Sequence, residues 1–458
     1  MRFYSTRNKN EFVNYTMAAL SGLAPDGGLF VPQEIPLYPA QVRSSLGSMD
    51  FIDIAFETVK PYVQDTIPNN VLSDIVQSAF TFNAPLVPVA DRYSLELFHG
   101  PTAAFKDFGA RFMARSFSYL RRNEDHPLRI LVATSGDTGG AVADGFFDVP
   151  GIYVTVLYPK GRVTPLQERQ IAGLGKNITA LAVEGSFDDC QRLVKAALAN
   201  ESVDTEKNSK KQPALSSANS INISRLIPQA VYYSAAAGRA FAGNIDYDEE
   251  ATPRIKGSPR PLEIKKGLIT FCVPSGNFGN LTAGLYAMKM GAPIKQFIAA
   301  TNINKTFPDY LNSGEYLTRV SQVTISNAMD VGAPSNFERM AAHFTLEEMR
   351  EIILGVSVND EETKETILRI HKEAGYFLDP HSAVGWKGVE KLITDNKING
   401  TDIFGILSTA HPAKFSEVVE PLVGLPPIPT SLTNAMERTV NAKTIPADVS
   451  ALMESLKE

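Results

Sequence analysis

The sequence has few cysteines, a single tryptophan and no long hydrophobic run. Cys190 and Cys272 lie far apart with no spacing that pairs them, so we expect two reduced thiols and no disulfide framework. No stretch approaches the roughly 18 apolar residues that a membrane helix needs. The polar first residues lack the apolar core of a secretory signal. These absences predict a cytoplasmic protein without a membrane partner.

A strong excess of either charge is also missing. The chain has 44 Lys and Arg against 50 Asp and Glu, which leaves a formal net charge of −6. Nucleic-acid binding normally requires a basic face, so no nucleic-acid partner is expected. A length of 458 residues with 44% hydrophobic residues suits a protein of two or three domains with a large core. We expect a monomer or a small homo-oligomer.

Several familiar catalytic signatures do not occur. The chain has no GxxxxGK[ST] loop and no GxGxxG fingerprint, so neither of the common nucleotide-binding loops is predicted. It has no GxSxG elbow of a serine hydrolase. Six histidines without an HExxH pair, and only two cysteines, give no metal-ligand cluster, so no metal is expected.

What the sequence does contain is an alternation of strands and helices, which predicts an α/β fold with a mostly parallel sheet. We expect an N-terminal domain at 1–85, a larger α/β region at 86–430 and a C-terminal extension at 431–458. The charged, proline-rich segment Gly243–Lys266 is typical of a surface loop. The expected strands are short apolar runs at Leu128–Thr134, Ile152–Tyr158, Leu268–Pro274, Phe297–Thr301 and Ile403–Ser408.

Two of these strands end in short loops that run directly into predicted helices. One loop is Ser135–Gly140, before a helix expected from Ala141, and the other is Ser275–Asn280, before a helix expected from about Leu281. The first N–H groups of a helix are unpaired and its dipole makes the spot positive, so such loops can hold phosphate or carboxylate. The same residue types also form ordinary turns and helix caps. Two such loops favour a ligand with two anionic groups.

Lys106 lies among small and aromatic residues, in the segment FHGPTAAFKDFGARF. Phe105, Phe108 and Phe112 follow helical spacing and form one apolar stripe beside it. A lysine held against apolar surface loses hydration, its pKa falls, and its neutral amine can form a Schiff base. The alternative is a solvated helix lysine, which is the commoner situation for this residue type.

Seven segments together resemble the threonine synthase family, in its short bacterial and fungal form. They stand in the family's order and span most of the chain, from roughly Ala24 to Phe415. Each alone is weak, but the set is very specific. The segments are HGPTAAFKDFGARF, TSGDTGGAVA, YPKGRVTPLQERQ, SSANSINISRL, VPSGNFGNLTAG, SNAMDVGAPSNFER and STAHPAKF.

This resemblance implies a pyridoxal 5′-phosphate (PLP) enzyme of the tryptophan-synthase-β type. That fold has two open twisted-sheet subdomains with the cofactor in the cleft between them, here with a small N-terminal domain added. Lys106 is implied as the catalytic Schiff-base lysine, and Thr409 as the hydroxyl that meets the pyridine nitrogen. Asp137 falls where many relatives of the wider fold carry an asparagine facing the ring hydroxyl. The cofactor phosphate is assigned to Ser275, Gly276, Asn277, Phe278, Gly279 and Asn280, and the substrate carboxylate to Ser135, Gly136 and Thr138.

The implied reaction converts O-phospho-L-homoserine and water to L-threonine and phosphate. PLP serves as the electron sink, and Lys106, displaced by the substrate amine, acts as general base first at Cα and then at Cβ. Phosphate leaves from Cγ and needs cationic support, because charge builds on it during elimination. The basic candidates for this support are Arg162, Arg225 and Arg111, and the polar candidates for substrate binding are Asn219, Ser220 and Asn222.

Two other functions fit the same motifs. A phospho-lyase would stop at elimination and release 2-oxobutyrate, so the product made from phosphohomoserine separates it from the synthase. A non-catalytic α/β protein would use the glycine loops for another phosphate or a nucleotide, and it would be colourless. A cofactor absorption band that depends on Lys106 separates the enzymes from this protein.

Overall fold

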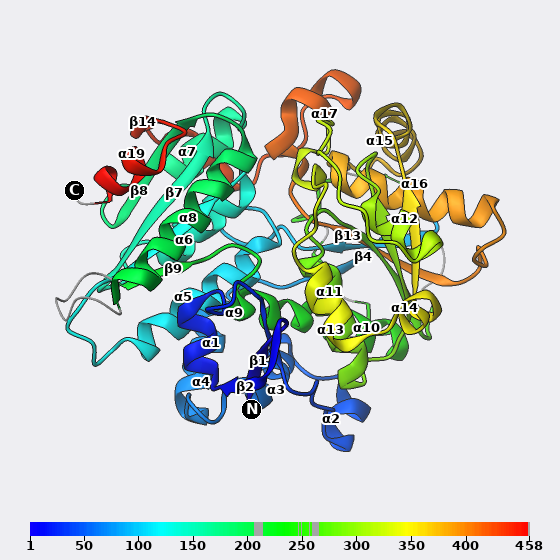
Figure 1. The fold of residues 1–458 in the computed structure, drawn as a ribbon. Coiled ribbons are helices and arrows are strands. Elements are labelled where there is room, and N and C mark those ends of the chain that lie inside the picture. Colours follow the sequence, from blue (N-terminus) through cyan, green and yellow to red (C-terminus); the bar gives the residue numbers. More distant parts are fainter. Residues whose placement is uncertain (206–213, 246, 249, 256, 259–264, 457–458) are drawn as a thin grey trace.

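The computed structural model describes residues 1–205, 214–245, 247–248, 250–255, 257–258 and 265–456. Figure 1 shows two α/β lobes side by side, with a smaller N-terminal unit packed below the junction between them. The expected α/β class with two sheet subdomains and an N-terminal domain is therefore confirmed. Within the described part of the chain, no helix combines the length and apolar character needed to cross a membrane.

The N-terminal unit contains a three-stranded antiparallel sheet in the order β2-β1-β3 and four helices. One face of α3 is apolar and buries Phe51, Ile54, Val59 and Tyr62, so this helix is held by tertiary packing. The element bounds are β1 Phe3–Ser5, β2 Asn8–Val13, α1 Tyr15–Ser21, β3 Phe30–Pro32, α2 Ala40–Ser45, α3 Phe51–Val63 and α4 Asn69–Ala79.

The first lobe contains a five-stranded, all-parallel sheet in the order β14-β8-β7-β6-β9. The predicted strands at 128–134 and 152–158 are confirmed as β6 and β7. The strand bounds are β6 Leu128–Ala133, β7 Ile152–Pro159, β8 Ile178–Glu184, β9 Ala214–Ser217 and β14 Ala442–Pro446. The helices are α5 Lys106–Leu120, α6 Asp137–Phe146, α7 Pro165–Ala172, α8 Phe187–Thr205, α18 Thr430–Met436 and α19 Val449–Ser455.

The second lobe contains a six-stranded sheet in the order β12-β11-β10-β13-β5-β4, parallel except for the β4–β5 hairpin. The other three predicted strands are confirmed as β10, β11 and β13. The strand bounds are β4 Leu86–Val89, β5 Arg92–Glu96, β10 Ile269–Pro274, β11 Ile294–Thr301, β12 Ile353–Ser357 and β13 Ile403–Ser408. The helices are α10 Ala230–Ala242, α11 Gly279–Met290, α12 Thr306–Ser313, α13 Phe337–His343, α14 Leu346–Ile352, α15 Asp360–Ala374, α16 Pro380–Thr394 and α17 Ser416–Val423.

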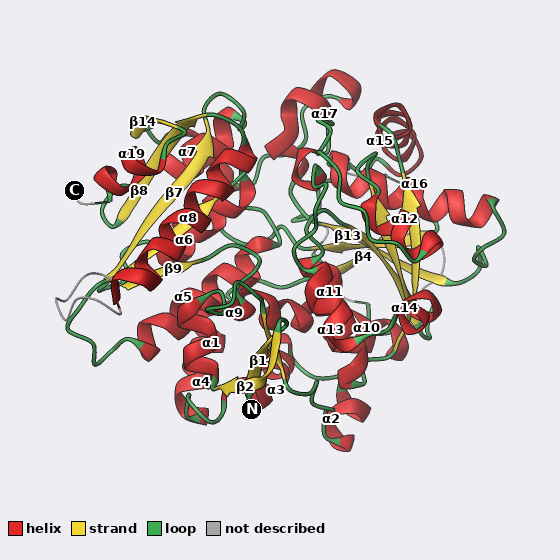
Figure 2. Ribbon diagram, in the orientation of Figure 1, coloured by secondary structure: helices red, strands yellow, loops and turns green. Residues whose placement is uncertain are grey.

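The remaining described elements are short. They are α9 Ile223–Leu226 and the 3₁₀ turns η1 Ile227–Gln229, η2 Asn327–Met329 and η3 Pro412–Phe415. Figure 2 shows that helices cover both faces of the sheets, as expected for buried parallel strands. Part of the segment at 243–266 lies outside the described residues. In its described part Thr252 is buried, and Arg254 donates a hydrogen bond of 2.8 Å to the Pro88 carbonyl.

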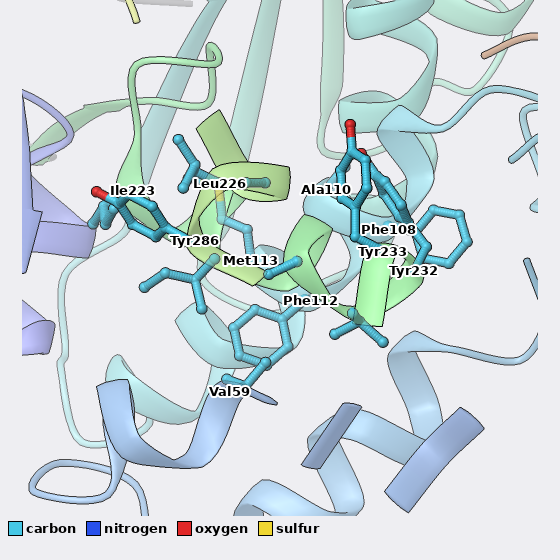
Figure 3. Close-up of a cluster of buried hydrophobic side chains, with 14 of the residues drawn as sticks. Val59, Phe108, Ala110, Phe112, Met113, Ile223, Leu226, Tyr232, Tyr233 and Tyr286 are labelled. Atoms are coloured by element: carbon cyan, nitrogen blue, oxygen red, sulfur yellow. The ribbon is translucent and has the colours of Figure 1, made fainter. Parts of the chain in front are cut away.

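Helix α5 crosses the junction and packs into an apolar cluster shared by the lobes and the N-terminal unit (Figure 3). Phe108 and Phe112 are fully buried in it, which confirms the predicted stripe for these two residues. Phe105 differs, because it precedes the helix, which begins at Lys106. Burying a phenylalanine side chain stabilises a fold by about 1.5–3 kcal/mol. The cluster therefore fixes the first turn of α5, and with it the backbone of Lys106.

Candidate active site

A cavity lies between the lobes, at the carboxyl ends of β6, β10 and β13. Ligands of open α/β sheets bind at this edge, where the loops after parallel strands converge. The lining residues that matter below come from these loops and the starts of α6 and α11, from the segment after β9 and from helices α5, α8, α9 and α16. They are Lys106, Ser135, Asp137, Thr138, Lys195, Asn219, Ser220, Arg225, Gly276, Asn277, Phe278, Gly279, Asn280, His381 and Thr409.

Lys106 is the first residue of helix α5 and lines this cavity. The backbone N–H of Phe105 donates 2.9 Å to the Thr409 carbonyl, which ties the start of α5 to the end of β13. The Lys106 Nζ lies 4.6 Å from the centre of the Phe105 ring and 3.8 Å from Asp137 Oδ2. Burial lowers the pKa of Lys106 to about 8, although Asp137 opposes this effect. Its amine can therefore be neutral and nucleophilic near neutral pH.

Asp137 is the first residue of α6, which begins four residues earlier than the predicted start at Ala141. Its Oδ1 accepts hydrogen bonds from Lys414 Nζ at 2.9 Å and Gln167 Nε2 at 3.0 Å. Burial alone would raise the pKa of Asp137, but Lys414 and Lys106 hold it well below its usual range. The carboxylate is therefore ionised and fixed beside Lys106.

The loop after β10 leads into α11, which begins at Gly279, two residues before the predicted start. Phe278 precedes it with a φ of 59°, and its side chain provides no cap for the helix. The helix start lines the cavity, so its N–H groups are positioned to bind an anion. Ser275 is buried, and its hydroxyl donates 2.9 Å to the Val273 carbonyl. It lies behind the described residues that line the cavity.

A buried hydrogen-bond network clamps this loop from outside. Asn277 Nδ2 donates 2.5 Å to Ser220 Oγ, and Asn336 Nδ2 donates 3.0 Å to the Asn277 carbonyl. The fully buried Arg339 donates 2.8 Å to Asn336 Oδ1 and 3.1 Å to the Phe30 carbonyl of the N-terminal unit. The sequence analysis gave Asn336 and Arg339 no role, although both fall in the segment SNAMDVGAPSNFER.

The loop after β6 forms the opposite wall. Ser135 and Thr138 line the cavity, whereas Gly136 is buried beneath it and donates 2.9 Å from its N–H to Thr134 Oγ1. Asn219 also lines the cavity. Its Nδ2 donates 2.7 Å to the Ala133 carbonyl and its Oδ1 accepts 3.2 Å from the Ala133 N–H. Asn219 therefore fixes the end of β6 as well as facing the site.

The three arginine candidates occupy different environments. Arg225 lines the cavity, is buried, and donates 2.7 Å to the Ala218 carbonyl, while its Nε has no hydrogen-bond partner among the described residues. Arg162 is exposed and lies outside the described cavity lining. Arg111 also lies outside it, and donates to the carbonyls of Ser78 and Ala79. Asn222 is similarly occupied, because it caps α9.

Lys195 and His381 also line the cavity, although neither was predicted as a site residue. Lys195 on α8 faces the cavity from a helix whose sequence carries no recognisable motif. His381 accepts 3.2 Å from the Ala328 N–H through Nε2, and its Nδ1 lies 2.8 Å from Asp379 Oδ1. Among the charged side chains of the described lining, Lys106, Lys195 and Arg225 outnumber the one carboxylate, Asp137. The cavity therefore suits an anionic ligand.

Three family models match the chain. "Pyridoxal-phosphate dependent enzyme" matches residues 93–409, "Threonine synthase N terminus" matches 2–80 and "Threonine synthase, C-terminal" matches 382–455. A threonine synthase of Escherichia coli is 39% identical over 99% of this chain and 98% of its own length. One of Saccharomyces cerevisiae is 35% identical over 91% and 88%. The first of these models and the cavity define the protein as a pyridoxal-phosphate-dependent enzyme.

Solved structures agree with this class of enzyme and identify the family within it. The crystal structure of threonine synthase from Escherichia coli aligns with a TM-score of 0.86 at 38% identity, covering 100% of this chain and 99% of that one. The PLP-bound threonine synthase from Brucella melitensis aligns with a TM-score of 0.84 at 34% identity and the same coverage. The chain belongs to the threonine synthase family.

The residues present fit the cofactor. A partly buried lysine of lowered pKa faces the cavity, as Schiff-base chemistry requires. The start of α11 provides N–H groups without a side-chain cap for a phosphate. Thr409 lines the cavity with its backbone fixed by Phe105. These three features come from three separate segments of the chain and meet in one cavity.

Proposed function

We propose that the protein converts O-phospho-L-homoserine and water to L-threonine and phosphate. The observation that carries this proposal is the position of Lys106, whose low-pKa amine opens into a cavity with two anion-binding loops. A substrate with a carboxylate and a phosphate, together with a phosphorylated cofactor, requires several such sites. Membership of the threonine synthase family supports the same substrate.

The catalytic group is Lys106. Bound PLP supplies an electron sink for the carbanion chemistry at the substrate. We assign the cofactor phosphate to the N–H groups of Gly276–Asn280 in the predicted loop Ser275–Asn280, because the Ser275 N–H already donates 2.9 Å to the Ala300 carbonyl. We assign the pyridine nitrogen to the Thr409 hydroxyl and the ring hydroxyl side to Asp137. Lys106 then moves protons at Cα and Cβ as general base and acid. Its lowered pKa suits this role, since proton transfer is most efficient when the pKa lies near the working pH.

Substrate binding is assigned to the opposite wall. Ser135 and Thr138 bind the carboxylate at the start of α6, where the helix dipole is positive. Gly136 supports this loop from below, because its N–H is already bonded to Thr134 Oγ1. Arg225 supports the departing phosphate, because it is the one of the three arginine candidates that lines the cavity. Lys195 adds a second positive charge on the same cavity. Asn219 fixes the end of β6 next to the carboxylate loop.

Absorption spectroscopy and product analysis test this function. The purified protein should show the visible absorption band of Lys106-bound PLP, and Lys106→Ala should lose both the band and the activity. Incubation with O-phospho-L-homoserine should release threonine and phosphate in equal amounts. Formation of 2-oxobutyrate in place of threonine would identify a phospho-lyase. A colourless protein that is unaffected by Lys106→Ala would refute both enzyme functions.

Further proposals concern the domain organisation, location and assembly of the protein. We propose the domain boundaries 85/86 and 430/431, a cytoplasmic location, a monomer or small homo-oligomer, and no nucleic-acid or membrane partner. The mild net charge of −6 supports the absence of a nucleic-acid partner. Light scattering of the purified protein would measure its oligomeric state.

A further inference from the structure

A second buried lysine lies behind the site. Lys414 belongs to η3, five residues after Thr409, and its side chain is fully buried. Its Nζ donates 2.7 Å to the Thr102 carbonyl and lies 2.9 Å from Asp137 Oδ1. Lys414 does not belong to the described lining of the cavity. It therefore contacts the site through Asp137, and the proposed reaction gives it no role.

Lys414 and Lys106 share one carboxylate. Lys414 Nζ approaches Oδ1 of Asp137 at 2.9 Å, whereas Lys106 Nζ lies 3.8 Å from Oδ2. The shorter contact has hydrogen-bond length, and the longer one does not. Gln167 adds another hydrogen bond of 3.0 Å to Oδ1. The negative charge of Asp137 is therefore directed mainly to Lys414.

This arrangement matters for the proton on Lys106. A carboxylate whose only cationic partner was Lys106 would form a full ion pair with it and hold its nitrogen protonated. A protonated nitrogen is a poor nucleophile and a poor base. With Lys414 present, the carboxylate is already compensated, and the second positive charge repels a proton at Lys106.

We propose that Lys414 is a positioning residue that holds Asp137 away from Lys106, and so keeps the Lys106 nitrogen easy to deprotonate. This inference rests on the proposed function, since it concerns the same lysine. The lowered pKa of Lys106 agrees with it, because Lys414 lowers that pKa while Asp137 raises it. An alternative is that Lys414 only anchors η3 to the Thr102 carbonyl, without influence on Lys106.

Other charged groups surround the pair and must be kept constant in a test. Arg225 on α9 also lowers the pKa of Lys106, and Asp379 before α16 raises it. Asp107 on α5 is close enough for Lys414 to lower its pKa. The ionisable groups to be left unchanged are therefore Arg225, Asp379, Asp107, His381 and His411.

The test is a pH titration of the PLP-loaded protein, measured by its visible absorption band. This band reports whether the nitrogen that joins Lys106 to the cofactor carries a proton. Lys414→Met keeps the length of the side chain and removes its charge. The midpoint of the titration should rise by about one pH unit or more, since a neighbouring charge shifts a pKa by about one to three units. An unchanged or lower midpoint in folded, PLP-loaded Lys414→Met would overturn the proposal.

A second variant has the opposite expected sign. Asp137→Asn removes the anion that favours the proton and leaves Lys414 in place, so the midpoint should fall. If Lys414→Met does not fold, this variant still tests the premise that Asp137 favours the proton, because a midpoint that stays constant or rises would contradict the proposal. A purely structural role for Lys414 predicts no opposite shifts in the two variants.

Lys391→Met is the matched control. Lys391 Nζ makes an ion pair of 2.8 Å with Glu362 and donates 2.9 Å to the Ser357 carbonyl, away from the described cavity lining. Its loss should leave the midpoint unchanged, and an equal shift in this control would overturn the specific role of Lys414. An unaltered protein without any visible band would instead refute the proposed function, and this inference with it.

Discussion

The close contact between helices α5 and α9 predicts that Gly109→Ala destabilises the protein. Gly109 lies one turn after Lys106 and faces Arg225 on α9. A Cβ built on Gly109 would lie 2.5 Å from the Arg225 carbonyl oxygen, and 3.3 and 3.4 Å from its C and Cα atoms. All three are backbone atoms, so no side-chain rotation can relieve the contact. Gly109→Ala must therefore move the two helices apart.

The size of the effect follows from two opposing contributions. Alanine in a helix is more favourable than glycine by about 1 kcal/mol. Overpacking a well-filled core costs about 1–3 kcal/mol, and the rigid backbone contact places Gly109→Ala near the upper end. We expect the free energy of unfolding to fall by about 2 kcal/mol. A shift of Arg225 relative to Lys106 by part of an ångström should also lower kcat/KM about tenfold, since a 1 Å misplacement can cost about a hundredfold.

Urea unfolding and steady-state kinetics on Gly109→Ala measure both quantities. Gly140→Ala on α6 serves as the control, because its added Cβ would meet only side-chain atoms of Gln170, the nearest at 3.2 Å. It should change stability much less. A Gly109→Ala protein that is more stable than the unaltered one, with the same kcat/KM, would refute the reasoning. Helix propensity alone would then determine the change in stability.

Three further predictions concern buried polar groups. Arg339→Met removes the donor that Arg339 provides to the carbonyls of Phe30, Ser220 and Ile221, so we expect a loss of about 3 kcal/mol in unfolding free energy and faster dissociation of PLP, measured by the visible band. Unchanged PLP retention would contradict a role of Arg339 in holding the loop after β10. Burial raises the pKa of Asp107 to about 6 from 3.8, so its ionisation costs stability as pH rises from about 4 to 6. The unfolding free energy of Asp107→Asn relative to the unaltered protein should rise over that range, and a flat difference would contradict it. Burial raises the pKa of Cys190 to about 12 and that of Cys272 further. Neither thiol should therefore react with a thiol reagent until the protein unfolds. Rapid labelling of the native protein would disprove this prediction.

The main strands were predictable because they are buried on both faces. β6, β7, β10, β11 and β13 each contain a run of mostly apolar residues that ends at loop residues, and a sequence shows such runs directly. β14 was not predicted, since its residues are mostly exposed and only Ile445 is buried. Its strand conformation depends on pairing with β8. Local sequence carries little information about such a strand.

The position at which α6 begins shows a second limit of prediction from sequence. The glycines of TSGDTGGAVA indicated a loop up to Gly140, yet the structure has a helix from Asp137. Thr134 Oγ1 accepts 2.8 Å from the Gly139 N–H, and a Cβ on Gly139 would lie 2.5 Å from Thr134 Cγ2. The glycine is there for close packing inside the helix. That reason is visible only in three dimensions.

The same limit applies to the site. Lys106 and the two loops that we propose to bind anions could be found from sequence, because each lies in a recognisable local segment. The choice among Arg111, Arg162 and Arg225 could not, since it depends on which of them faces the cavity. Lys414 was visible in STAHPAKF, but the tertiary fold alone brings it to Asp137.

The order of strands in the two sheets limits how the chain can be divided. β5 precedes every strand of the first lobe but pairs with β13 in the second, and β14 follows the second lobe but pairs with β8 in the first. More than half of the chain separates Glu184 at the end of β8 from Ala442 at the start of β14. Neither sheet is thus encoded by one uninterrupted stretch. If the chain were cut once between the lobes, each fragment would lack a strand of its own sheet or carry a strand of the other sheet. The sheet edge exposed in this way would be prone to aggregation.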